Sequence, residues 1–127
     1  MDDNFDRNEK LYRAVYPPEV VDMFWKRDGS VSSAAFADAR GLSVDRGDYR
    51  NDDDVVRDMN SRFRGSIIRV YAKNCMDTGA VLRYLPTRKN IYHTEIHGSE
   101  QNPLLSRSQR RFLACRAVIV NQYREFY

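Results

Sequence analysis

Short segments with the pattern of β-strands recur along this chain, and they constrain its fold more than any other feature. Residues 66–72, "SIIRVYA", are β-branched and apolar, which indicates a buried strand. Residues 10–16, "KLYRAVY", predict an earlier strand, because Leu11, Arg13 and Val15 alternate with Tyr12, Ala14 and Tyr16. Pro17 and Pro18 end this strand. Further strands are predicted at 42–45, 80–86 and 91–97.

Two main helices are predicted between and after these strands. In residues 51–65, Asn51 or Asp52 can cap the helix, and the following aspartates suit its positive N-terminal end. Capping explains this run of acids better than a metal site does. The last helix is predicted from about Ser106, where "SRSQ" offers a capping box, through Arg124. Its expected apolar face contains Phe112, Cys115, Ile119 and Tyr123.

A third, shorter helix is predicted at residues 17–29, with its apolar face on the sheet. The grouped strands and few helices favour an α+β fold, with a mixed or antiparallel sheet of four to six strands and two main helices packed on it. The length of 127 residues fits one domain. We expect a globular domain over 10–127, preceded by an acidic tail at 1–9 that can be flexible.

Several classes of protein are excluded by composition. No apolar run approaches the roughly 20 residues that span a bilayer, and the acidic start does not resemble a signal peptide, so we expect a cytoplasmic protein that does not contact membranes. Cys75 and Cys115 form neither a CxxC pair nor a disulfide framework. Both are expected to be buried free thiols.

The charge is divided unevenly along the chain. Residues 1–60 hold nine Lys and Arg against fourteen Asp and Glu, a net charge of −5, whereas residues 61–127 hold twelve against four, a net charge of +8. The basic half can attract phosphate or nucleic acid. It can also be neutralised by the acidic half in the folded protein, and the sequence leaves both interpretations open.

Both histidines lie in the segment "IYHTEIHG" with a glutamate midway between them. On a strand, the period of two places His93, Glu95 and His97 on one face. His93 and Glu95 are therefore candidate acid/base residues, because a carboxylate orients a neighbouring imidazole for proton transfer. A metal would need further ligands from elsewhere, so none is predicted. The alternative is a polar row on the outer face of a sheet.

Two other segments supply candidate ligand-binding residues. Arg13 lies in the first predicted strand, and Ser32 and Ser33 lie in irregular chain, where they can donate hydrogen bonds to a phosphate. With His97, they would suit a pocket for a phosphate-bearing ligand. No Walker loop, GxGxxG fingerprint or GxSxG elbow is present.

A basic surface is also predicted at the start of the last helix. Arg107, Arg110 and Arg111 lie where the helix dipole disfavours positive charge. With Arg88 and Lys89, and with Tyr84 and Tyr92 for base stacking, they would suit nucleic acid.

The order of several short motifs resembles a group of small, uncharacterised bacterial proteins. The shared segments are "LYR" with Pro17, "VSS.AF" at 31–36, "LSVD" at 42–45 and "N..H..I.G" at 90–98. This resemblance covers most of residues 11–120 and implies kinship without an activity.

A more distant likeness is to ADP-ribosyltransferase-like folds. It implies that Arg13, Ser32 or Ser33, and Glu95 or Glu100 surround NAD in a transferase-like enzyme, and the sequence leaves open whether its role is in toxicity or defence or in housekeeping. Two hypotheses therefore remain. The first is an interaction or regulatory domain without a cofactor, which recognises a phosphate-bearing ligand, nucleic acid or a protein partner. The second is a small nucleotide-processing enzyme.

Overall fold

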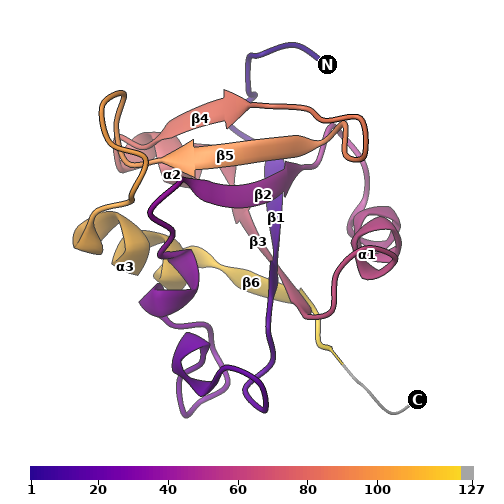
Figure 1. Ribbon diagram of the computed structural model, residues 1–127, viewed down its shortest axis with the longest axis vertical. Coiled ribbons are helices and arrows are strands. Elements are labelled where there is room, and N and C mark those ends of the chain that lie inside the picture. Colours follow the sequence, from indigo (N-terminus) through magenta and orange to yellow (C-terminus); the bar gives the residue numbers. More distant parts are fainter. Residues whose placement is uncertain (124–127) are drawn as a thin grey trace.

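The computed structural model describes residues 1–123, which form one antiparallel sheet with helices on both faces (Figure 1). The six strands lie in the order β4-β5-β2-β1-β3-β6, and this confirms the predicted α+β class. No helix within residues 1–123 combines the length and the apolar run that a membrane crossing requires. The strands are β1 (Lys10–Val15), β2 (Leu42–Arg46), β3 (Ser66–Tyr71), β4 (Val81–Tyr84), β5 (His93–His97) and β6 (Val118–Asn121). The helices are α1 (Asp52–Asn60), α2 (Ala72–Asp77) and α3 (Arg107–Arg116), and two 3₁₀ turns are η1 (Asp22–Phe24) and η2 (Ser33–Phe36).

Helix α1 begins where its sequence predicts, but it ends at Asn60, before the predicted end at residue 65. The Asn51 side chain accepts a hydrogen bond from the Asp54 amide, which caps the helix. Val55 and Met59 are buried against β1 and β3, where Tyr12 and Ile67 complete a small apolar cluster. This cluster covers one face of the sheet.

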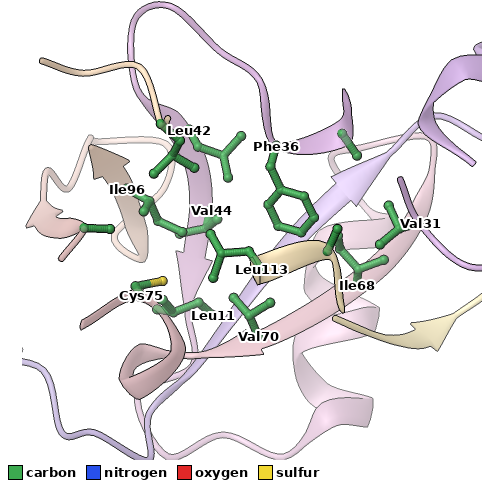
Figure 2. Packing of buried hydrophobic residues seen from close by; sticks show 14 of the residues in the cluster. Leu11, Val31, Phe36, Leu42, Val44, Ile68, Val70, Cys75, Ile96 and Leu113 are labelled. Carbon is green, nitrogen blue, oxygen red and sulfur yellow. The ribbon is translucent and has the colours of Figure 1, made fainter. Parts of the chain in front are cut away.

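The main core covers the opposite face of the sheet. Alternate residues of β1, β2, β3 and β5 meet side chains from α2, α3 and η2 there (Figure 2). Phe36 and Leu113 are among the largest side chains of this core that are fully buried. The labelled residues of this core are Leu11, Val31, Phe36, Leu42, Val44, Ile68, Val70, Cys75, Ile96 and Leu113.

Helix α3 begins at the predicted capping box of Ser106 and Gln109 but ends well before the predicted boundary. The prediction of a helix through residue 124 is wrong, because residues 118–121 form β6 and pair with β3. Their β-branched side chains favour a strand, and the open edge of β3 supplies hydrogen-bond partners. Arg124 itself lies outside the described residues.

The cysteines differ from the prediction in one respect. Cys75 is buried in the main core, and burial raises the pKa of its thiol to about 12. Cys115 is exposed, so the prediction that both thiols are buried is wrong. The early end of α3 places Cys115 on the outer side of a short helix instead of within a long apolar face.

The prediction of a helix at residues 17–29 is also wrong, because the structure forms only the 3₁₀ turn η1 there. Val20 and Met23 are 63% and 66% exposed, so the expected apolar face does not pack on the sheet. The chain turns instead so that Trp25 pairs with Val31 and its indole N–H donates to the Tyr16 carbonyl at 2.7 Å.

The N-terminal segment is anchored on β2 by Arg46. This guanidinium forms a bidentate ion pair with Glu9, in which Nε and Nη2 each donate to a carboxylate oxygen at 2.8 Å. Both side chains are almost fully buried. It also donates to the carbonyls of Asp2 and Asn4. Through these contacts Arg46 joins the acidic N-terminal segment to β2.

Candidate functional site

Strand β5 places the two histidines and the glutamate in a row on one face of the sheet. Thr94 and Ile96 are fully buried on the opposite face, as the alternation predicts. The side chains of His93, Glu95 and His97 are 23%, 23% and 14% exposed. The row is thus half-buried and still open to a ligand.

Both imidazoles of the row turn toward the same carboxylate. His97 Nε2 lies 2.9 Å from Glu95 Oε1, and His93 Nε2 lies 3.4 Å from Glu95 Oε2. When Nε2 carries the proton and donates it to Glu95, Nδ1 of the same ring is a free acceptor. This arrangement can orient an imidazole for proton transfer at Nδ1.

Gly41, which directly precedes the neighbouring strand β2, packs against the row. A Cβ at this position would lie 2.6 Å from His97 Nε2 and 2.8 Å from Glu95 Oε1, and the residue has a φ of +109°. Both the close approach and the backbone conformation therefore require glycine. Further along β2, Ser43 and Asp45 pair in register with Glu95 and His93.

Asp45 has a structural role, because it joins β2 to the segment after α1 and to the β4–β5 loop. Its carboxylate is buried and accepts from Arg62 at 2.6 Å and from the Asn90 amide at 2.8 Å. Because its two oxygens are bonded to the end of α1 and to the β4–β5 loop, Asp45 does not pair with Arg13.

Arg13 lies at a fork between β1 and β2. The two strands pair at Leu11 with Arg46 and at Tyr12 with Asp45, and then diverge, so β2 crosses β1 steeply (Figure 1). The Arg13 side chain bridges the fork, with Nε donating to the Ala35 carbonyl and Nη1 to the Ser43 carbonyl, each at 2.9 Å.

The charge of Arg13 has no partner of opposite sign at short range. Within residues 1–123, no carboxylate lies within 4.0 Å of its guanidinium. Burial lowers the pKa of Arg13 from its usual value, and the more distant charge of Asp38 offsets this in part. Arg13 is therefore a largely buried cation whose only hydrogen bonds within residues 1–123 are to two carbonyl oxygens.

A cleft of about 300 Å³ opens at the fork, beside the C-terminal end of α1. It brings together two of the residues that the sequence nominates, Arg13 and His93. Its other lining residues are Tyr12, Ala14, Ser43, Val44, Asp45, Met59 and Phe63. We call this site the fork cleft.

Other nominated residues lie outside the fork cleft. The Ser32 hydroxyl donates to the Met23 carbonyl at 2.6 Å, within the loop that holds η1, and Ser33 begins η2. Neither serine lines the cleft, and Glu95 and His97 lie further along β5. Glu100 pairs with Arg83 at 2.9 Å.

The structure does not join the predicted basic residues into one surface. Arg107 and Arg111 are exposed and Arg110 is half-buried at the start of α3, beyond one end of β5. Loop 85–92, which contains Arg88 and Lys89, lies beyond the other end of β5 (Figure 1).

The tyrosines expected to stack on bases are already covered by arginines. The Arg46 guanidinium lies 4.8 Å from the centre of the Tyr84 ring, and that of Arg50 lies 3.4 Å from the centre of the Tyr92 ring. These rings stabilise buried charges instead of presenting open faces. Within residues 1–123, no group of three or more His, Cys, Asp or Glu side chains is arranged to hold a metal ion.

Ser43 and Phe63 are among the fork-cleft residues that the sequence analysis did not nominate. Ser43 alternates with the apolar Leu42 and Val44, and this pattern places it on the polar face of β2. Phe63 continues the helical spacing of the apolar residues Val55 and Met59 in the sequence, but it follows the end of α1 and is 41% exposed. The alternation could have identified Ser43, whereas no pattern in the sequence marks Phe63.

Comparisons with protein-family models, curated proteins and solved structures found no match to this chain. The function must therefore be argued from the geometry of the fork cleft.

Proposed function

We propose that this protein is a binding domain for a phosphate-bearing ligand, which it holds in the fork cleft. The observation that carries the proposal is the charge of Arg13, which lies largely buried at the fork without a carboxylate within 4.0 Å among residues 1–123. A buried cation without a counterion is unfavourable, and an anionic ligand would supply the missing charge.

Other arginines of the sheet show the contrast. Arg46 pairs with Glu9, and Arg69 pairs with Asp52 at 2.6 Å, so the protein neutralises these charges itself. A guanidinium has five N–H donors, and in Arg13 the Nε and Nη1 groups donate to carbonyls while Nη2 has no partner within residues 1–123. Nη2 is not sealed from solvent, because the only fully buried side-chain nitrogen or oxygen in this part of the chain without a partner is Arg69 Nε. Arg13 can therefore donate to a phosphate oxygen.

The surroundings of Arg13 suit the same ligand. His93 and the exposed Ser43 line the cleft and add hydrogen-bonding groups. The cavity beside Glu9 and Tyr49 has about the same volume, 280 Å³. Its two cationic residues, Lys10 and Arg50, pair with Asp52 and Asp58, so it offers no comparable positive charge to a phosphate.

A thermal-shift titration tests the proposal directly. The probes are inorganic phosphate and ribose 5-phosphate, at low and moderate salt, because a ligand at about 100 times its Kd stabilises the folded state by about 2.7 kcal/mol. We expect a shift that is lost in Arg13→Met and reduced in His93→Ala. The matched control is Arg107→Met, which removes an exposed arginine at the start of α3 and should leave the shift unchanged.

The outcome also separates the phosphate-bearing ligand from nucleic acid. A shift with short oligonucleotides that falls steeply with salt and is lost in Arg107→Met would favour a nucleic-acid surface on α3. The absence of a shift with either phosphate probe would refute the proposal. His93→Ala keeps the test valid if Arg13→Met does not fold.

A second candidate function is supported by the contacts of Glu95 with His93 and His97 at 3.4 and 2.9 Å. These contacts suit an acid/base role in a nucleotide-processing enzyme, for which NAD is the cofactor to test. Release of nicotinamide from NAD, abolished by Glu95→Gln, would support an enzyme related to ADP-ribosyltransferases. The position of Ser32 and Ser33 outside the fork cleft argues against this candidate.

A further inference from the structure

The fork cleft adjoins a second cavity on the same side of the sheet. This cavity has a volume of about 560 Å³ and lies where the chain leaves α1 and where β6 ends. Phe63 lines both cavities and is thus the boundary between them. The other lining residues are Asn60, Arg64, Asn121, Gln122 and Tyr123.

Phe63 is held in a defined position although its ring is 41% exposed. Its amide donates to the Met59 carbonyl at 2.8 Å, which fixes the backbone at the end of α1. The Arg62 guanidinium lies 4.9 Å from the centre of the ring and is itself bonded to Asp45 and Asp58. An exposed ring in a fixed place is a surface on which a flat aromatic group can stack.

Gly65 fixes the turn that follows Phe63. A Cβ at Gly65 would lie 2.7 Å from the Val15 carbonyl oxygen, so this turn packs directly against the end of β1. The Tyr123 amide donates to the Ser66 hydroxyl at 3.0 Å, which brings the end of the β6 segment to the same place.

The second cavity is rich in amide side chains. Asn60, Asn121 and Gln122 can each donate and accept hydrogen bonds, and within residues 1–123 their side chains bond to no other group. Amides of this kind match the mixed donors and acceptors on the edge of a nucleobase. Arg64 adds a positive charge that pairs with no carboxylate in the same part of the chain.

We infer that the ligand is a nucleoside monophosphate, with its phosphate at Arg13, its base on Phe63 and the edge of the base at the amides of the second cavity. This inference rests on the proposed function and specifies its ligand. The inference rests on the order of groups along the two cavities, which is a cationic side chain, an exposed aromatic ring and amide side chains. This order matches that of the phosphate, the base face and the base edge in a nucleotide.

Comparing nucleotides with ribose 5-phosphate tests this inference, since the sugar phosphate lacks only the base. Isothermal titration would use AMP, GMP, CMP and UMP. We expect at least one nucleotide to bind about tenfold or more tightly than ribose 5-phosphate, because stacking on an aromatic side chain is worth about this much. Phe63→Ala should abolish the advantage of the nucleotides over ribose 5-phosphate, whereas Phe63→Tyr should retain it.

A matched control is Met23→Ala, which removes another exposed apolar side chain, from η1. It should change neither affinity. Equal binding of all four nucleotides and ribose 5-phosphate would overturn the inference but leave the proposed function standing. A nucleotide advantage that survives in Phe63→Ala would also overturn the inference and leave the proposed function standing. Failure of every phosphate probe to bind would refute both the inference and the proposed function.

Discussion

Arg46 and Arg13 lie on adjacent strands, and the protein treats their charges in opposite ways. Arg46 is enclosed by the Glu9 carboxylate, by two main-chain carbonyls and by the rings of Phe5 and Tyr84. Arg13 receives two carbonyls and no carboxylate within 4.0 Å among residues 1–123. The first arrangement is closed, while the second leaves room for a ligand.

The pKa values of the two guanidinium groups shift in opposite directions because only Arg46 has a carboxylate partner within hydrogen-bond distance among residues 1–123. The hydrogen bonds that Arg46 donates to Glu9 raise the pKa of Arg46 and outweigh the effect of burial, whereas burial lowers the pKa of Arg13. The comparison shows that burial alone does not identify a binding residue. The feature that distinguishes Arg13 is the absence of a carboxylate within 4.0 Å of its guanidinium among residues 1–123.

The largest effect on stability is expected when Arg46 loses its carboxylate partner. Glu9→Ala leaves Arg46 buried and unpaired, because the side chains of Arg46 and Glu9 are 4% and 6% exposed. We expect the free energy of unfolding to fall by about 3–5 kcal/mol, as when one partner of a buried ion pair is removed. Urea denaturation followed by circular dichroism measures this loss.

The control for Glu9→Ala is Glu100→Ala, which removes the partner of Arg83. The side chains of this pair are 37% and 67% exposed, so the loss should be at most about 1 kcal/mol. Similar losses in the two variants would show that the Arg46 site is not the closed structure described above.

An intermediate effect is expected at the fork itself. Arg13→Met removes the donors to the Ala35 and Ser43 carbonyls, and we expect a loss of about 2–3 kcal/mol in water. The variant should also lose the stabilisation that phosphate confers on the wild type, so the difference between the two proteins should grow when phosphate is added. A constant difference would make Arg13 a purely structural residue.

The smallest effect on stability is expected at Asp52. Its carboxylate contacts Tyr12, Lys10 and Arg69, but its side chain is 32% exposed. Burial raises the pKa of its carboxyl, but the hydrogen bond from Tyr12 and the charges of Arg69 and Lys10 outweigh this, and the net shift is downward. A depressed folded pKa contributes stability that is present above the unfolded value of about 3.9 and is lost as pH falls through the folded value.

Asp52→Asn should therefore cost about 1 kcal/mol at pH 7, and the difference from wild type should shrink below about pH 4. Thermal denaturation at a series of pH values from 7 to about 2 measures it. A difference that stayed constant over this range would mean that the charge of Asp52 does not matter to stability.

Local patterns were sufficient to predict most of the fold. The capping residues Asn51 and Ser106 mark where α1 and α3 begin, because a cap depends only on the next few residues. The end of α3 could not be predicted in this way. Whether residues 118–121 continue a helix or form β6 depends on the free edge of β3, which lies far away in the sequence.

The candidate site was predicted only in part, for the same physical reason. The alternation of β5 places His93 and Glu95 on one face without any knowledge of the tertiary structure. The role of Arg13 depends on the point at which β1 and β2 stop pairing, and that of Phe63 on the early end of α1. Neither is encoded in a local pattern.

The strand order has a consequence for how fast the chain folds. The central strand β1 comes first in the sequence, and its neighbour β3 follows only after β2 and α1. β2 must likewise wait for β5, and β3 for β6, so β4 and β5 form the only hairpin of sequential strands joined by a short loop within the described residues. Because distant segments must meet before most of the sheet can form, we expect refolding in milliseconds to seconds, a slow rate for a domain of this size. The fork that holds Arg13 can form only after such encounters.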